Sequence, residues 1–367
     1  MKVAVLIFSF FVSTAEAALV SQIDSIKYST RVPYNTPSDN GLVFSQAIAP
    51  LYQQNKLYKR RLDSLQKTIP LVCNKYVQNH IDAYISTPKQ KERIGKLLGL
   101  SRYYFPIFEK ALKEVGVPEE IKFITIIESA LDPHASSYAG AKGLWQFMSP
   151  TARGYGLRID NYVDERKDPV QASYAAATYL KDVYNQFGDW LLAIAAYNCG
   201  ASVVLKAIEK SGGIADFWHI RPHLPKQTQR YVPAFIATNY VMSYYKKHGI
   251  APLAIGLTGI TEIIQVHNVV SLASVARAAN LDVAILKVLN PSYKQHIING
   301  SKANPKTLIT PLLSKQVYAP VYEVLNTKMV SAQTKSKVEV ANMPSRSIGK
   351  KKPAPLKKKL KPSRGHI

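Results

Sequence analysis

Apolar residues recur at intervals of three and four along most of the chain up to about residue 250, and strand-like alternation is scarce there. This pattern predicts amphipathic helices that bury one face in a common core. We therefore expect an all-α region, with helices over residues 47–66, 80–96, 101–115, 118–131, 169–187, 190–197, 203–210 and 228–245.

The pattern changes near residue 260. Short apolar segments predict strands at 262–266 and 308–311, and helical spacing predicts helices at 271–279 and 282–289 between them. The order strand, helix, helix, strand predicts a small α+β module over residues 260–320, so the chain as a whole is expected to be mainly α.

One carboxylate lies on the apolar face of a predicted helix. The proline at 118 suits a first helical position, and the Asp-Pro pair at 132–133 predicts the end. Helical spacing then places Glu128 on the same face as Ile121, Ile124 and Leu131. Burial raises the pKa of a carboxyl group, which prepares it to donate a proton near neutral pH. The alternative is a structural glutamate that bonds a backbone amide or an arginine in the core.

The first residues have the pattern of a secretory signal peptide. Lys2 precedes an apolar run over residues 3–12, and Ala15-Glu16-Ala17 is a small-x-small cleavage site. We expect a signal peptide at 1–17 and an exported protein, periplasmic or associated with the cell envelope. No cysteine stands at the cleavage site, so no lipid anchor is expected, and no later segment is apolar enough to span a membrane.

The formal net charge of +24 indicates polyanionic partners. Peptidoglycan carries peptide carboxylates, and envelopes hold other anionic polymers. Nucleic acid is the other usual partner of basic proteins, but the export signal argues against it and no binding motif is present. Residues 326–367 contain lysine runs at 350–352 and 357–359 and are expected to be a disordered tail, either a tether to anionic envelope polymers or a solvated end.

Four sequence blocks carry a resemblance to a known enzyme family. They are Glu128-Ser129 and the residues up to 135, Gly-Ala-Lys-Gly-Leu-Trp-Gln-Phe-Met at 140–148, Ala-Ala-Tyr-Asn-Cys-Gly at 195–200, and Gln-Thr-Gln-Arg-Tyr-Val-Pro at 227–233. In this order and spacing the chain resembles lytic transglycosylases of the soluble Slt type, and most closely the murein transglycosylase D group. The resemblance covers about residues 101–245. It implies a lysozyme-like catalytic domain at 101–250, after an N-terminal arm and helical lead-in at 18–100.

The module at 260–320 resembles a LysM module, a small glycan-binding fold. The strand and helix order and the sequence Leu289-Asn290-Pro291 carry this resemblance. The usual Gly-Asp-Thr-Leu after the first strand is replaced by Asn-Val-Val-Ser-Leu at 268–272, and the segment at 292–305 is longer than usual. Glycan binding and a purely packing role therefore both stay open.

The resemblance implies an unusual use of a single carboxyl group. Ordinary glycosidases need two carboxylates, whereas the four blocks supply only Glu128. Glu128 would protonate the oxygen between N-acetylmuramic acid and N-acetylglucosamine, and would then accept a proton from the 6-hydroxyl of the muramic acid. That hydroxyl attacks the anomeric carbon, which gives a 1,6-anhydro product. No cofactor or metal is implied.

Matching positions imply the supporting residues. Ser137, Gln146 and Met148 would line the sugar cleft, and Tyr197 would hold Glu128 or the substrate through its hydroxyl. Asn198 is grouped with these substrate-side residues, although a role in bracing the backbone is favoured. The residues interpreted as support or core are Ser129, Trp145 and Phe147.

Two departures from the family pattern stand out. Gln227 replaces a usual glutamate, which keeps hydrogen bonding but removes a charge. Cys199 replaces a usual small residue; export permits a disulfide with Cys73, but we favour two separate thiols. The alternatives for function are a lysozyme-like hydrolase, in which water replaces the 6-hydroxyl, and a wall-binding scaffold with a silent catalytic domain.

Overall fold

The computed structural model describes residues 44–256 and 260–326 of the 367-residue chain, and these fall within one compact unit. We call the first range the helical region and the second the C-terminal module. The predicted signal peptide, most of the arm that follows it and the basic tail from residue 327 lie outside the described residues. Those expectations stay predictions.

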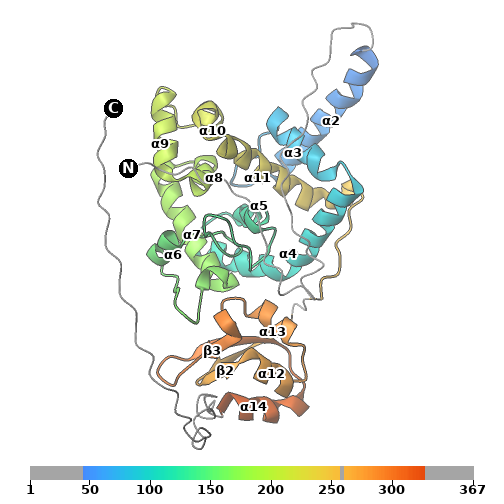
Figure 1. The fold of residues 1–367 in the computed structure, drawn as a ribbon. Helices are drawn as coiled ribbons and strands as arrows, with labels where there is room; N and C mark the ends of the chain where they lie inside the picture. Colours follow the sequence, from blue (N-terminus) through green and yellow to red (C-terminus); the bar gives the residue numbers. More distant parts are fainter. Residues whose placement is uncertain (1–43, 257–259, 327–367) are drawn as a thin grey trace, which may run out of the picture. The chain divides into compact units, whose positions relative to one another are not determined.

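The helical region is built from α-helices joined by turns and loops, including a long loop between Ser129 and Ser149 (Figure 1). Its mainly α class confirms the prediction from hydrophobic spacing. The helices are α2 (Phe44–Leu65), α3 (Lys75–Ile85), α4 (Pro88–Val115), α5 (Ile124–Ser129), α6 (Ser149–Gly154), α7 (Pro169–Phe187), α8 (Trp190–Cys199), α9 (Ala201–Lys210), α10 (Phe217–Ile220) and α11 (Lys226–Tyr244). Single 3₁₀ turns are η1 (Glu119–Phe123), η2 (Glu165–Lys167), η3 (Arg221–His223) and η4 (Tyr245–His248).

Side-chain caps fix where the longer helices begin. Asn74 and Thr87 accept hydrogen bonds from first-turn amides of α3 and α4, and Asp168 and Asp189 do the same for α7 and α8. Such caps satisfy amides that have no partner within the helix.

The break between α3 and α4 differs from the prediction. The sequence predicts one helix from 80 past 96 and another at 101–115, whereas α3 ends at Ile85 and α4 continues unbroken to Val115. The Thr87 cap and Pro88 at the first position start the new helix. Pro106 lies inside α4 without ending it, as the predicted helix over 101–115 requires.

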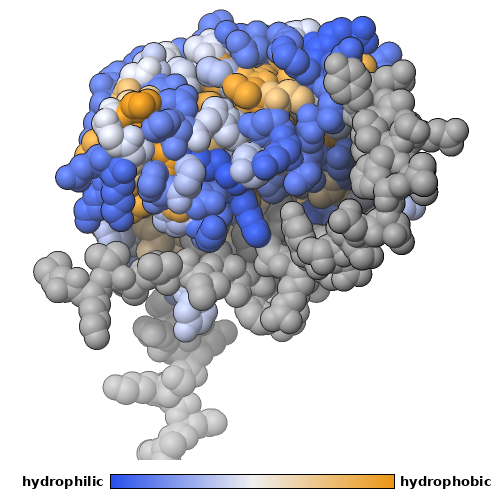
Figure 2. Space-filling model, turned by 90° about the horizontal axis from the view of Figure 1, so that it is seen from above, coloured by the Kyte–Doolittle hydropathy of each residue, from blue (hydrophilic) through white to orange (hydrophobic). Residues whose placement is uncertain are grey.

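The core of the helical region lies between α4, α7, α8 and α11, with the short α5 among them (Figure 1). Trp145 is fully buried; its ring meets Phe108 edge-on at 5.4 Å, and its Nε1 donates to Ser173 Oγ at 2.9 Å. Phe147 is also buried, so the core assignment of both aromatic residues is confirmed. Figure 2 shows one largely hydrophilic face on which hydrophobic side chains form only small patches.

The chain leaving the helical region is packed closely against α4. Leu253 N donates to Gly95 O at 2.9 Å. A Cβ atom at Gly95 would lie 2.6 Å from Ala251 O, and one at Gly99 would lie 2.2 Å from Leu253 O. Both positions therefore require glycine, because any side chain would displace the connecting segment.

The C-terminal module contains β1 (Thr261–Val266), β2 (Val269–Ser271), α12 (Leu272–Ala278), α13 (Val283–Leu289), β3 (Ile297–Asn299), β4 (Lys306–Pro311) and α14 (Tyr318–Asn326), with 3₁₀ turns η5 (Lys294–His296) and η6 (Lys315–Val317). β1 pairs antiparallel with β4, from Thr261 opposite Pro311 to Val266 opposite Lys306. β2 pairs antiparallel with β3. The predicted strand, helix, helix, strand order is confirmed, whereas β2, β3 and α14 were missed. The two strands have three residues each, which is too short for a periodic signal.

Cys73 and Cys199 are both free, as favoured from the sequence. In the described ranges, no single helix has the length and apolar character to cross a membrane; α8 and α9 meet those criteria only as a pair bent by 118°.

The packing of α2 generates a stability prediction. Leu62 is fully buried against the core, whereas Leu205 on α9 is 46% exposed. Leu62→Ala should lower the free energy of unfolding by about 2–5 kcal/mol, because the cavity adds to the lost burial. Leu205→Ala is the control and should change it by less than about 0.5 kcal/mol. Denaturant unfolding followed by circular dichroism measures both; equal effects would contradict the docking of α2.

Candidate active site

Glu128 lies on the last turn of α5, which is shorter than predicted. The chain from Pro118 first forms the 3₁₀ turn η1, and the α-helix spans only Ile124–Ser129. It ends because Ala130 and Leu131 have φ values of 53° and 63°, in the left-handed region. The single helix predicted over 118–131 is therefore wrong at both ends. The predicted apolar face is nevertheless buried, with Ile121, Ile124 and Leu131 fully inside.

The Glu128 carboxyl group is held by a tyrosine. Tyr231 on α11 donates its hydroxyl to Glu128 Oε1 at 2.5 Å. Glu128 itself keeps some exposed surface, so the group is accessible as well as enclosed. Burial raises the pKa of Glu128 to about 7, against the opposing effect of the Tyr231 bond. At neutral pH the protonated and ionised forms are both populated, as a group that gives and then takes a proton requires.

The structural alternative for Glu128 was an arginine partner in the core. Within residues 44–256 and 260–326, Glu128 forms no ion pair with any lysine, arginine or histidine. Its raised pKa therefore has desolvation as its main cause, with no neighbouring cation to lower it.

Tyr197 does not hold Glu128, contrary to one of its two predicted roles. Its hydroxyl donates to Trp145 O at 2.6 Å, which ties α8 to the loop before α6. Burial, and then the nearby Glu128 charge, raise the pKa of Tyr197, so the two residues are close without bonding. Sequence reasoning missed Tyr231, although it is the only tyrosine of the fourth block and its neighbours form the core.

Ser129 supports the turn that carries Glu128. Its Oγ lies 2.9 Å from both Thr125 O and Leu144 O, so its single proton is shared between the two carbonyl oxygens. The first bond lies within the helix and the second joins α5 to the following loop. This confirms the supporting role expected for Ser129.

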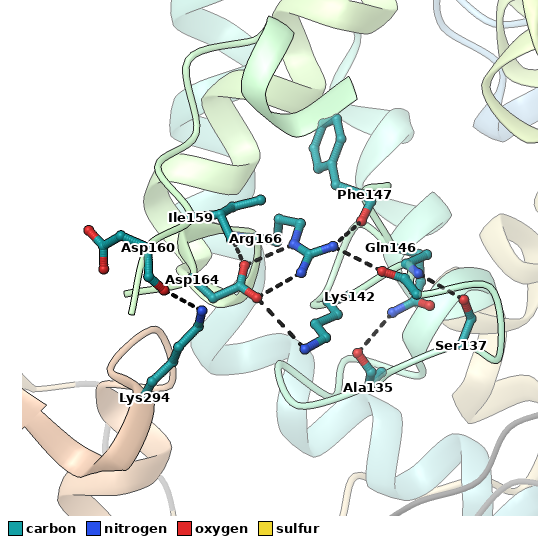
Figure 3. Close-up of polar contacts among 12 residues, drawn as sticks. Ala135, Ser137, Lys142, Gln146, Phe147, Ile159, Asp160, Asp164, Arg166 and Lys294 are labelled. Carbon is teal, nitrogen blue, oxygen red and sulfur yellow. Dashed lines mark hydrogen bonds and ion pairs between the residues drawn. The ribbon is translucent and has the colours of Figure 1, made fainter. Parts of the chain in front are cut away.

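Residues 135–148, which we call the sugar-side loop after the role that the resemblance predicts, contain Ser137, Gln146 and Met148. Figure 3 shows the first two. Antiparallel bridges join Ser136 to Lys142 and Lys142 to Phe147. Ser137 is buried, and its Oγ accepts a bond from Ala141 N at 3.0 Å. The loop is thus a tight, internally bonded unit.

Gln146 is the most constrained residue of this loop. Its φ is 50°, and its Nε2 donates to Ala135 O at 3.2 Å and to Gly143 O at 2.8 Å. Its Oε1 is buried and has no hydrogen-bond partner among the described residues. A buried acceptor without a partner costs free energy, and this oxygen can meet a ligand only after the loop or the side chain shifts.

Met148, Asn198 and Gln227 differ in their burial and hydrogen bonding. Met148 is half-buried and stands at the start of α6. Asn198 Oδ1 accepts a bond from Thr228 Oγ1 at 2.8 Å, which joins α8 to α11 through side chains; the predicted brace is present but is not to the backbone. Gln227 is exposed in the first turn of α11.

Comparison with known proteins gives this geometry a family context. Residues 105–219 match the family model described as the transglycosylase SLT domain. Residues 105–219 are therefore similar to an SLT domain. Residues 260–318 match the LysM-like domain of lytic transglycosylase MltD. Both matches confirm the resemblance inferred from the sequence.

Curated relatives carry related names. Membrane-bound lytic murein transglycosylase D of Escherichia coli strain K12 is 34% identical over 204 residues, which are 54% of this chain and 44% of the relative. Membrane-bound lytic murein transglycosylase C of Haemophilus influenzae strain PittEE is 28% identical over 225 residues, 56% of this chain and 57% of the relative. The chain thus spans about half the length of the curated relatives it matches.

Solved structures were also found. An inactive mutant of the lytic transglycosylase Slt from Pseudomonas aeruginosa is 25% identical over 41% of this chain and 25% of that one, with a TM-score of 0.34. The 70 kDa soluble lytic transglycosylase of Escherichia coli is 19% identical over 65% of this chain and 42% of that one, with a TM-score of 0.35. At these TM-scores the likenesses carry no argument about this chain.

The SLT match contains Glu128 and every predicted substrate residue, but it ends before α11. The partner of the Glu128 carboxyl group, Tyr231, therefore lies beyond the matched range. In the described residues, no group of three or more His, Cys, Asp or Glu side chains is placed to hold a metal ion.

The raised pKa of Glu128 predicts a pH-dependent stability. The unfolded chain releases the Glu128 proton near pH 4.5 and the folded protein near pH 7, so stability falls as the pH rises between these values. Glu128→Gln removes this loss and keeps an acceptor for Tyr231. The variant should match the wild type below about pH 4 and exceed it above pH 7, by at most about 3 kcal/mol. Denaturant unfolding at several pH values measures this; a variant less stable than wild type at pH 8 would contradict the buried acid.

Proposed function

We propose that this protein is a lytic transglycosylase that cleaves the glycan strands of peptidoglycan and leaves 1,6-anhydro-N-acetylmuramic acid ends. The observation that carries the proposal is the Glu128 carboxyl group, with a pKa raised to about 7 and a hydroxyl donor on Oε1, inside an SLT domain. The names of the matched relatives support the same reaction class.

In the first step, protonated Glu128 transfers its proton to the glycosidic oxygen between N-acetylmuramic acid and N-acetylglucosamine. The bond from that oxygen to the anomeric carbon breaks, and its electron pair stays with the departing sugar. Glu128 is left as a carboxylate, which the Tyr231 hydroxyl stabilises through its bond to Oε1.

In the second step, the Glu128 carboxylate accepts the proton of the 6-hydroxyl on the same muramic acid. The freed oxygen attacks the anomeric carbon and closes the 1,6-anhydro ring, which returns Glu128 to its acid form. The attack is intramolecular, so no water molecule has to be ordered as nucleophile.

The other acidic side chains close to these loops are already engaged. Burial raises the pKa of Asp132, but its Oδ1 accepts His134 N at 2.8 Å in the turn after α5. Asp168 and Asp189 cap helices, Asp160 accepts loop amides, and Asp164 pairs with Arg166. A two-carboxylate mechanism has no second candidate among them, which favours the single-acid reaction.

We assign the sugar contacts to the sugar-side loop. Gln146 Oε1, which has no partner, suits an acetamido N–H once a shift of the loop exposes it, and Ser137 and Met148 lie on the same loop. Tyr197 and Asn198 act by joining α8 to the loop and to α11. We also propose export to the cell envelope, which mass spectrometry of the mature N-terminus would test at Ala17.

Tyr231→Phe tests the proton-shuttle arrangement. The Tyr231 bond lowers the pKa of Glu128, so its removal should raise that pKa above about 7. Because the first step needs the protonated acid, the alkaline limb of kcat/KM should move to higher pH. An unchanged limb, or a shift to lower pH, would contradict the role of Tyr231. Tyr240→Phe on the same helix is a control, since its hydroxyl bonds Arg61 and should leave the limb in place.

Product analysis of digested sacculi tests the function itself. Glu128→Gln should reduce cleavage by roughly 10²- to 10⁴-fold, the usual contribution of a general acid and base. Glu119→Gln, at an exposed position nine residues before it, should cleave like wild type.

Mass spectrometry then separates the alternatives. Wild-type products with anhydro-muramic acid ends support the proposal, whereas reducing ends carrying an added water identify a hydrolase. Binding of sacculi without any cleavage would identify a scaffold.

A further inference from the structure

An arginine outside the sugar-side loop adds to the bonds that Ser129 and Tyr197 make to it (Figure 3). Arg166, in the 3₁₀ turn η2, donates through Nη1 to Gly140 O at 2.9 Å and to Phe147 O at 3.4 Å. Gly140 lies in the first half of the loop, three residues after Ser137, and Phe147 lies at its end, directly after Gln146. One guanidinium group therefore spans residues 140–147, which include Gln146.

The guanidinium group is itself fixed by Asp164. Arg166 Nε and Nη2 donate to the two Asp164 carboxylate oxygens, both at 2.8 Å. Both residues are buried, at 5% and 1% exposure. Burial alone would raise the pKa of Asp164, but the bonds and charge of Arg166 outweigh it and lower that pKa, so the pair stays ionised.

The backbone of the same turn touches the loop directly. A Cβ atom at Gly143 would lie 1.8 Å from Arg166 O, and Gly143 has a φ of 82°. The loop thus lies against the Arg166 backbone and is bonded by the Arg166 side chain, so a shift of η2 moves the loop with it.

The C-terminal module contacts residues 160–164, the segment that leads directly into the turn η2. Ser292 O accepts a bond from Asp164 N at 2.9 Å, Tyr162 O accepts one from Lys294 N at 2.7 Å, and Val163 bridges to Tyr293. Lys294 Nζ also bonds Asp160 O (Figure 3). The segment 292–294 therefore runs alongside residues 160–164 as a short antiparallel pair.

Apolar contacts cross this boundary in both directions. Val163 of the helical region is buried in the core of the C-terminal module. Leu289 at the end of α13 is buried in the core of the helical region. Exchanged core residues of this kind make the contact part of the fold rather than a surface encounter.

We propose that Arg166 is a positioning residue for the sugar-side loop, and that the C-terminal module holds Arg166 in place by docking on residues 160–164. This inference rests on the proposed function, because it concerns the same substrate site. It assigns the LysM-like module a role within catalysis in addition to any glycan contact of its own.

The geometry explains why the residue is arginine. A planar guanidinium offers donors on two edges, so it binds the Asp164 carboxylate in a fork and still reaches two loop carbonyls. A lysine ammonium keeps the charge but cannot bond the Asp164 carboxylate and the two loop carbonyls at the same time. Arg166→Lys is therefore the variant that removes the positioning while retaining the ion pair.

Full-length Arg166→Lys should lower kcat/KM on glycan strands by roughly 10- to 100-fold, since small misplacements of substrate contacts have large effects. Its alkaline pH limb should stay where it is in wild type, because the Glu128–Tyr231 bond is untouched. Arg61→Lys is the matched control, as Arg61 Nη1 bonds Tyr240 OH at 2.8 Å between α2 and α11; it should lose thermal stability without the kinetic loss. Wild-type kinetics in a folded Arg166→Lys protein would overturn the proposal, and so would a loss that the control reproduces.

A binding measurement keeps this test separate from the test of function. Isothermal titration of a purified peptidoglycan tetrasaccharide into Glu128→Gln, with and without Arg166→Lys, should show at least about tenfold weaker binding in the double variant. If the wild type binds the glycan but never cleaves it, the proposed function is wrong. The difference in binding with and without Arg166→Lys still shows whether Arg166 positions the loop.

The clamp is tested from the module side with Leu289→Ala. This change loosens the docking without altering any residue of the loop, and it should weaken tetrasaccharide binding in the Glu128→Gln background. Combined with Arg166→Lys, Leu289→Ala should weaken binding little further, because both changes act by displacing the same loop. Fully additive losses of binding free energy would show that the two residues act independently and would contradict the proposal. If Leu289→Ala lowers the melting temperature but leaves tetrasaccharide binding unchanged, the C-terminal module does not position the loop.

Discussion

The site depends on the balance between burial and one hydrogen bond at Glu128. Desolvation pushes the pKa of the carboxyl group upward, and the Tyr231 hydroxyl holds it near 7. Deeper burial would raise the pKa until the group stayed protonated at neutral pH. More hydrogen-bond donors would lower the pKa until the group stayed ionised. The contacts of α11 with α5 keep these two residues together, so the packing of a long helix against a very short one sets the chemistry.

Irregular backbone surrounds this pair. Ala130, Leu131 and Gln146 all have positive φ values, which cost roughly 1–2 kcal/mol each for residues other than glycine. Bonds from Ser129, Tyr197 and Arg166 hold the same segments in place. Strained backbone that the surroundings over-determine is typical of functional sites, and here it lets α5 stop directly after the carboxylate.

The sequence predicted the helical class, the position of Glu128 on an apolar face and the burial of Trp145, because hydrophobic spacing reports burial directly. It did not predict the end of α5, since two left-handed residues of ordinary type leave no local signal. It also gave Tyr197, and not Tyr231, a contact with Glu128 or the substrate. Both tyrosines lie in matched blocks, and which hydroxyl reaches a carboxylate 103 residues away depends on helix packing alone. The network of Asp164 and Arg166 was invisible for the same reason: its loop partners are backbone carbonyls, which any sequence supplies.

The glycines at 95 and 99 have a mechanical consequence. They let the segment at 251–255 lie directly on the α4 backbone, with a hydrogen bond at Gly95. A pull on the C-terminal module therefore reaches α4 before it reaches the end of α11. Since Tyr231 is on α11, tension carried along the connecting segment first reaches a helix that contains neither the acid nor its partner.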